Sequence, residues 1–307
     1  MKGRAPRSIP GEPGTFDALS HLFIEVRHAI EGFQGGTHPS LHMSPSIEFA
    51  EHRRYEKGDD LRTVDWKALA RTDRHFVKSH EREAQLAGLL LLDCSASMDY
   101  RGSRAAMSKL AFARVLLGAM GYLLIRQGDA AGLVTFADRR HLYLPPSNRP
   151  GHFAVLMDHL VAARAQEDCT TDYDTTLKEV ASRLGQRSMI VLVTDLWNAS
   201  KETEIALSSL CARQHDVVLF HLLSPDEIDL PFEGRVQFVG MEKDGAVDAD
   251  PTAIRGDYRD ELKALQEHWR RTARRAGIDL VSAVTSDSPA RVLAAFARNR
   301  TGKRTAP

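Results

Sequence analysis

Four consecutive leucines, Leu89 to Leu92, lead directly into an aspartate, and this stretch constrains the fold more than any other part of the chain. An apolar run without polar alternation is typical of a strand that is buried on both faces of a parallel sheet. The run ends at Asp93, and two hydroxyl side chains, Ser95 and Ser97, follow at alternate positions. Because parallel α/β sheets bind ligands at the carboxyl ends of their strands, the sequence predicts a site of oxygen donors where this strand ends.

Carboxylate and hydroxyl oxygens suit Mg²⁺ or Mn²⁺ better than zinc or copper. The same residues also fit a plainer interpretation, in which Asp93 ends the strand and Ser95 or Ser97 caps the helix that follows. Two later segments favour the cation. Thr171 lies in a polar loop before a helix-like segment, and Asp195 ends a second apolar run over residues 190–195.

These five side chains converge only if the two strands are neighbours, as expected at the topological switch point of a doubly wound sheet. We therefore predict a divalent cation held by Asp93, Ser95, Ser97 and Thr171, with Asp195 bound directly or through water. Mg²⁺ prefers about six oxygens and keeps several waters, so one coordination position is expected to stay open to a further ligand.

Strand-like and helix-like segments alternate from residue 88 onward, which predicts an α/β fold with a doubly wound, mostly parallel sheet. We expect strands over 88–93, 131–136, 188–194, 216–222 and 278–284, and helices over 103–126, 150–165, 174–185, 201–213, 257–276 and 288–299. Residues 140–144 are expected to pair antiparallel with 131–136. Residues 224–256 form an expected insertion with a small hairpin around 235–239.

The remaining segments complete the expected domain organisation. Residues 1–15 form a disordered tail, 16–87 an N-terminal region of mixed structure, 88–300 the α/β domain and 301–307 a second tail. Within the N-terminal region, apolar residues at helical spacing from Leu22 to Phe33 predict a helix that ends at Gly35-Gly36. Residues 75–78 are a candidate strand.

Composition excludes several classes of function. The chain has 307 residues and a formal net charge of zero, so nothing favours nucleic acid or an anionic membrane. Its three cysteines are widely spaced, which argues against a disulfide framework or a zinc knuckle and fits a reducing cytoplasm. The longest uncharged apolar stretch, 115–125, is shorter than the roughly 20 residues of a membrane span.

Catalytic motifs are absent from the sequence. Ser95 lacks the Gly-x-Ser-x-Gly context of a hydrolase nucleophile, and Cys94 has no activating neighbour in sequence. A phosphoaspartyl phosphatase resembles the first strand, with Asp93 as nucleophile, but a serine stands where its second acidic residue is expected. No phosphate-binding Gly-x-x-x-x-Gly-Lys-Ser/Thr loop and no clustered histidines occur. We therefore assign no catalytic residue, and keep a divalent-metal-dependent hydrolase as the alternative function.

The order Asp93-x-Ser95-x-Ser97, then Thr171, then Asp195 resembles the metal-ion-dependent adhesion site of von Willebrand factor type A domains. The resemblance covers about residues 88–300. Glycine is common in these domains at three places where this chain has other residues, namely 96, 169–170 and 196, but none of these changes removes a ligand oxygen.

A polar block upstream contains Arg53-Arg54-Tyr55-x-x-Gly58-Asp59-Asp60 and Asp65-Trp66-Lys67. These motifs resemble a more specific bacterial group, the domain of unknown function 58 family, whose members are typically encoded beside MoxR-type AAA+ ATPases. The arginines of this block could bind a phosphate or nucleic acid, or they could belong to internal salt bridges. We treat Arg53, Arg54, Asp65 and Trp66 as candidate partner-binding residues.

Together the two resemblances imply a cytoplasmic, non-enzymatic adaptor that binds protein through Mg²⁺ or Mn²⁺. An acidic side chain of the partner would complete the coordination sphere. The partner implied is a MoxR-type ATPase, which assembles or remodels client complexes in a chaperone-like manner.

Overall fold

The computed structural model describes residues 13–34, 52–54, 76–78, 86–166, 171–185, 187–242 and 245–304. The chain divides into two compact units, one made of residues 1–39 with 87–307 and the other of residues 40–86. In the smaller unit, strands β1 (His52–Arg54) and β2 (Phe76–Lys78) pair antiparallel, with Arg53 opposite Val77. This confirms the strand expected at 75–78. Asp65 and Trp66 lie outside the described residues.

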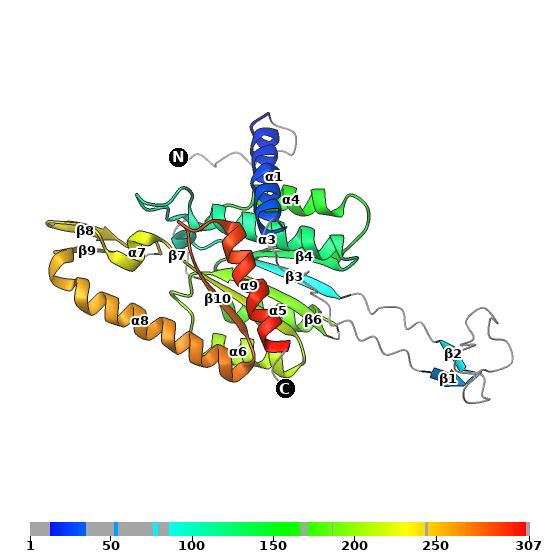
Figure 1. Ribbon diagram of the computed structural model, residues 1–307. Helices are drawn as coiled ribbons and strands as arrows, with labels where there is room; N and C mark the ends of the chain where they lie inside the picture. Colours follow the sequence, from blue (N-terminus) through cyan, green and yellow to red (C-terminus); the bar gives the residue numbers. More distant parts are fainter. Residues whose placement is uncertain are drawn as a thin grey trace. The chain divides into compact units, whose positions relative to one another are not determined.

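The larger unit is built on a six-stranded sheet of order β10-β7-β6-β3-β4-β5, in which only β5 runs antiparallel (Figure 1). The α/β, doubly wound fold class is therefore confirmed, as is the antiparallel partner of 131–136. The strands are β3 (Ala87–Asp93), β4 (Ala130–Phe136), β5 (Arg140–Ser147), β6 (Ser188–Thr194), β7 (Asp216–Leu223) and β10 (Asp279–Val284).

The first strand of this sheet, β3, lies at its centre. From β3 the chain passes to β4 on one side, and it later returns to β6 on the other side. This reversal places the topological switch point between β3 and β6, where α/β sheets bind ligands.

Helices cover both faces of the sheet (Figure 1). Helices α1 (Pro13–Gln34), α3 (Lys109–Arg126), α4 (His152–Ala162) and α9 (Pro289–Arg304) contact one another on one face. Helices α5 (Tyr173–Arg183), α6 (Lys201–Ala212) and α8 (Pro251–Ala276) lie on the other.

Helix α1 belongs to the α/β unit, so the domain division differs from the expected one, which placed residues 16–87 in a separate region. The reason is that α3 is apolar almost all round, so the side that faces away from the sheet must also be buried, and α1 packs against it. Helix α1 packs closely against α3, since a Cβ added at Gly118 of α3 would lie 2.7 Å from Cγ2 of Val26 on α1.

Several helix boundaries differ from the expected ones. Helix α3 begins at Lys109 and not at 103, because residues 102–104 form a loop that binds α7 (Pro225–Asp229). Helix α8 begins at Pro251, six residues earlier than expected, since the Asp250 side chain caps it by accepting from the Thr252 N–H. Helices α1 and α9 extend into the segments expected to be tails, to Pro13 and Arg304.

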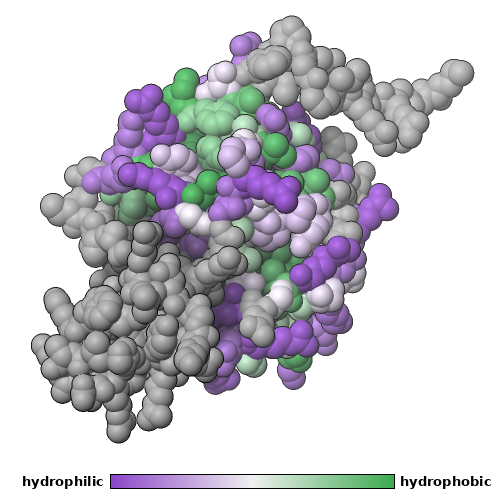
Figure 2. All heavy atoms as spheres, turned by 90° about the vertical axis from the view of Figure 1, so that its right-hand side faces the viewer, coloured by the Kyte–Doolittle hydropathy of each residue, from purple (hydrophilic) through white to green (hydrophobic). Residues whose placement is uncertain are grey.

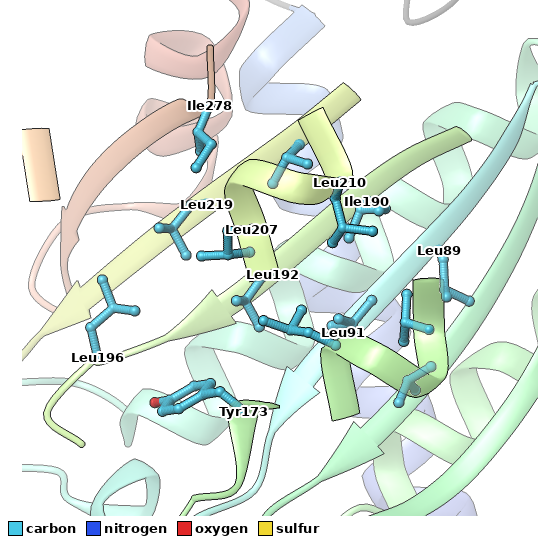
Figure 3. Close-up of a cluster of buried hydrophobic side chains, with 14 of the residues drawn as sticks. Leu89, Leu91, Tyr173, Ile190, Leu192, Leu196, Leu207, Leu210, Leu219 and Ile278 are labelled. Atoms are coloured by element: carbon cyan, nitrogen blue, oxygen red, sulfur yellow. The ribbon is translucent and has the colours of Figure 1, made fainter. Parts of the chain in front are cut away.

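The core of the face covered by α5, α6 and α8 is a cluster of leucines and isoleucines from β3, β6 and β7 and from these helices (Figure 3). Tyr173 and Leu196 lie at its edge. On the side of the molecule seen in Figure 2, hydrophilic and hydrophobic side chains are interspersed over the described surface. Strands β8 (Val236–Val239) and β9 (Ala246–Ala249) form the small hairpin that was expected in the insertion.

Candidate functional site

The two sequence-predicted aspartates lie at the ends of adjacent strands. Asp93 is the last residue of β3, Asp195 follows the last residue of β6, and Leu92 pairs with Val193 in the parallel ladder between them. Both carboxylates are buried. The strand neighbours expected from the doubly wound topology therefore bring these two acids to one place.

Three groups hold the Asp93 carboxylate. The Ser95 backbone N–H donates to Oδ1 at 2.9 Å, and the Thr194 hydroxyl donates to Oδ2 at 2.7 Å. The Tyr173 hydroxyl lies 3.1 Å from Oδ2 and 2.7 Å from the Thr194 hydroxyl. Tyr173 begins α5, so this helix is anchored at the end of β3 by its first side chain.

Burial, and after it the negative charge of Asp195, raises the pKa of Asp93 from 3.8 to about 6, although the hydrogen bonds from Ser95 and Thr194 oppose the rise. A carboxylate with a raised pKa in a buried site lacks a compensating positive charge. A cation that binds here would supply that charge.

The two predicted serines lie in the loop after β3. Ser95 precedes a 3₁₀ helix (Ala96–Asp99), yet its side chain makes no cap hydrogen bond there, and helix α3 is capped instead by Ser108. The Ser95 hydroxyl lies 3.1 Å from the Ser97 hydroxyl. Ser95 is fully buried, whereas Ser97 is half-buried.

A buried lysine, which the sequence analysis missed, neutralises Asp195. Lys109 Nζ lies 2.7 Å from Asp195 Oδ2 and 2.6 Å from Oε1 of Glu227 on α7. Burial alone would lower the pKa of Lys109, but the two carboxylates hold it above its ordinary value. Burial would in turn raise the pKa of Asp195, and Lys109 keeps it below its usual range.

The position of Glu227 depends on the loop before α3. Asp226 accepts hydrogen bonds from the Ser103 backbone N–H at 2.7 Å and from Arg104 Nε at 2.7 Å. Gly102 has a φ of +67°, and a Cβ there would lie 2.7 Å from the Asp226 carboxylate, so this close approach requires glycine. The contacts between this loop and α7 therefore hold Glu227 in the position where it pairs with Lys109.

A second missed residue, Glu242, lies beside the serines. Its carboxylate accepts a hydrogen bond from the Asn198 side chain, and the Ser97 and Ser95 hydroxyls lie close enough to lower its pKa. Burial raises the pKa of Glu242, these serine donors oppose the rise, and Asp195 adds to it. No local pattern marked Glu242, because it lies in the loosely patterned insertion.

The structure does not bring the other sequence-predicted residues into contact with the two aspartates and the two serines within the described part of the chain. Thr171 lies on the loop two residues before α5, and within the described ranges it makes no hydrogen bond to the two serines or the two aspartates. Arg53 and Arg54 lie on β1 of the smaller unit, and Asp65 and Trp66 lie outside the described residues.

The donor set fits a hard divalent cation. The Ser95 and Ser97 hydroxyls carry two protons, and they face three carboxylates, those of Asp93, Asp195 and Glu242. The nearby ammonium of Lys109 is already shared with Glu227. No group of three or more His, Cys, Asp or Glu side chains in the described part of the chain is arranged to hold a metal by itself, so a cation here would need the hydroxyls as ligands.

Leu196 follows Asp195 with a φ of +60°, a left-handed conformation that favours glycine. This explains why glycine is common at this position in the domains that the sequence resembles. The chain tolerates leucine because its side chain is fully buried in the core cluster (Figure 3) and its N–H donates to the Thr194 hydroxyl at 3.1 Å.

A family model described as "Protein of unknown function DUF58" matches residues 51–268. An uncharacterized protein of Mycobacterium tuberculosis is 27% identical over 275 residues, which cover 88% of this chain and 85% of that protein. An uncharacterized protein of Mycobacterium bovis matches with the same values.

Among solved structures, the conserved hypothetical protein BatB from Bacteroides thetaiotaomicron is 15% identical, with a TM-score of 0.48, over 71% of this chain and 99% of that one. The SpRpn10 VWA domain is 14% identical, with a TM-score of 0.39, over 68% and 94% of the two chains. Within the described residues, no helix has both the length and the apolar character of a membrane span.

Proposed function

Because the chain belongs to the DUF58 family and gathers hydroxyls and carboxylates at the switch point of its sheet, we propose that it is a protein-binding adaptor that contacts its partner through a divalent cation. Mg²⁺ or Mn²⁺ would be held at the ends of β3 and β6 by Asp93, Ser95, Ser97 and Thr171, with Asp195 bound directly or through water. The ion would supply a fixed positive charge and a coordination position for an incoming oxygen ligand.

The observation that carries this proposal is the imbalance around the two serines, where two hydroxyl protons and one shared ammonium face several buried carboxylates. Buried carboxylates without enough donors are costly, and a divalent cation offsets that cost. Ser97 is half-buried, so the ion would remain accessible to a large partner.

The partner that the family resemblance implies is a MoxR-type AAA+ ATPase, with this protein as its adaptor towards client complexes in the cytoplasm. An acidic side chain of the partner would take the open coordination position. Arg53, Arg54, Asp65 and Trp66 of the smaller unit remain candidate residues for further contacts.

A hydrolase would need a general base that can reach a substrate beside the ion. The buried imidazole near the site is His221, whose Nε2 has no hydrogen-bond partner in the described residues. Burial lowers its pKa to about 4, and its side chain is 1% exposed, so it cannot reach a substrate at the surface. No observation favours the hydrolase, and we propose that the chain does not catalyse a reaction.

The test is a calorimetric titration of a MoxR-type ATPase from the same organism into the purified protein, once with Mg²⁺ and once with EDTA. We expect binding in Mg²⁺, its loss in EDTA and weaker binding by Ser97→Ala. Ser182→Ala is the matched control, since that exposed hydroxyl donates to the Glu179 carbonyl within α5, away from the two serines. Equal affinity for the ATPase in Mg²⁺ and in EDTA would show that the cation site plays no part in partner binding.

A further inference from the structure

The hairpin β8–β9 extends from the sheet with mostly exposed side chains, yet Glu242, in the loop between its two strands, is buried. Val239 and Val247 are 67% and 62% exposed, whereas Glu242 is 4% exposed. A hydrogen bond from the Gly240 N–H to the Gly245 carbonyl, 2.7 Å long, closes the loop in which Glu242 lies. A charged side chain is rarely buried on an exposed hairpin without a specific partner.

The partners of Glu242 belong to the candidate cation site. Asn198, three residues after Asp195, donates to one carboxylate oxygen. Ser97 and Ser95 also lie close to the Glu242 carboxylate, close enough that their hydroxyls lower its pKa. The Glu242 carboxylate is therefore directed at the two hydroxyls that are expected to bind the ion.

This placement is unfavourable without a cation. Glu242 lies near the negative charge of Asp195, whose one counter-charge, Lys109, is shared with Glu227. Each serine hydroxyl has one proton to donate, and both already contact other acceptors. A divalent cation between the serines and Glu242 would turn this repulsion into attraction.

We propose that Glu242 is a ligand that the chain itself supplies to the cation, at the position that an acidic side chain of a partner would otherwise take. The inference rests on the proposed function of the site. It deepens that function, because a partner must then displace Glu242, and recognition is limited by the fraction of molecules in which that position is free.

The test uses the full chain and Mn²⁺ as the probe. Bound Mn²⁺ relaxes the protons of exchanging water, and the relaxation per bound ion rises with the number of waters in its coordination sphere. Glu242→Ala vacates a position to water, so we expect higher relaxivity per bound Mn²⁺ and a dissociation constant raised on the order of 10-fold. Glu242→Gln, which keeps the shape of the side chain, is expected to weaken Mn²⁺ binding in the same direction.

Two controls define the result. Asp248→Asn removes an exposed carboxylate from the same hairpin and is expected to change neither quantity. Sodium acetate, a minimal carboxylate, is expected to lower the relaxivity of Mn²⁺ bound to Glu242→Ala more than that of the wild type, because the vacated position is open to it.

The outcomes separate the two proposals. Mn²⁺ binding that depends on Asp93 but is the same in Glu242→Ala and Asp248→Asn would overturn the role of Glu242 and leave the cation site intact. Mn²⁺ binding that survives Asp93→Ala unchanged would overturn the site itself, and the role of Glu242 with it.

Discussion

Replacing Lys109 by methionine tests the charge balance of the site most directly. Methionine keeps the unbranched apolar stem and removes only the ammonium, which is fully buried between two carboxylates at 2.7 and 2.6 Å. We expect Lys109→Met to fold with a clearly lower free energy of unfolding, because Asp195 and Glu227 lose their shared counter-charge.

The magnitude follows from opposing contributions. At an effective dielectric constant of about 20, two unit charges at such distances attract by roughly 6 kcal/mol, and the desolvation of the ammonium offsets several kcal/mol of this. Breaking a buried pair by removing one partner costs about 3–5 kcal/mol in measured cases. We expect a loss in this range for Lys109→Met.

Urea denaturation followed by circular dichroism measures the loss. Lys263→Met is the matched control, because its side chain is 70% exposed and lies 3.6 Å from Asp260, so it should cost less than about 0.5 kcal/mol. Adding Glu227→Gln to Lys109→Met should recover part of the loss, since it removes one of the two stranded charges.

Mg²⁺ provides a second measurement on the same variants. Without Lys109 the site carries one more uncompensated negative charge, so Mg²⁺ should restore more stability to Lys109→Met than it adds to the wild type. A loss no larger than that of Lys263→Met, with no extra response to Mg²⁺, would refute the reasoning.

Three further outcomes are expected. Mg²⁺ at about ten times its dissociation constant should add roughly 1.4 kcal/mol and raise Tm by about 2–4 °C in a thermal melt, and Asp93→Ala should abolish the shift. Without divalent cations, the raised pKa of Asp93, about 6, means that the folded state binds a proton more tightly than the unfolded state. The contribution of this proton to stability is therefore fully present below the ordinary pKa of 3.8 and is lost as the pH rises through 6. Urea melts should show the free energy of unfolding increasing by about 1.4 kcal/mol from pH 7 to pH 5. The affinity for Mn²⁺ should fall over the same range, because the proton competes with the ion for Asp93. Tyr173→Phe should cost about 1 kcal/mol in urea melts, because the Thr194 hydroxyl still donates to Asp93 when the Tyr173 hydroxyl is gone; an unchanged midpoint would contradict the role given to that hydroxyl.

Much of the fold and part of the site follow from local features of the sequence. The apolar runs 88–93 and 188–194 identify buried strands, because only a strand covered on both faces tolerates such a run. The alternation of strands and helices implies parallel crossovers, and these bring the carboxyl ends of adjacent strands to one edge. Asp93 and Asp195 could be placed together on these grounds.

The sequence pattern could not identify the residues that adjust the charge of the site. Lys109 stands 86 residues from Asp195 and 118 from Glu227, and its sequence neighbours indicate only a position inside the helix expected over 103–126. Glu242 lies in an insertion with no periodicity. The apolar residues at helical spacing in α1 predict that one face of this helix is buried, but they do not indicate that it packs against α3.

The difference has a physical cause. Periodicity and strand ends depend on backbone geometry over a few residues, so the sequence by itself determines the sheet, its central strand and the acids at its edge. Whether a charged side chain is buried depends on what packs over it from distant segments. The tertiary structure alone therefore decided that an ammonium neutralises Asp195 and that a carboxylate of the same chain faces the two serines.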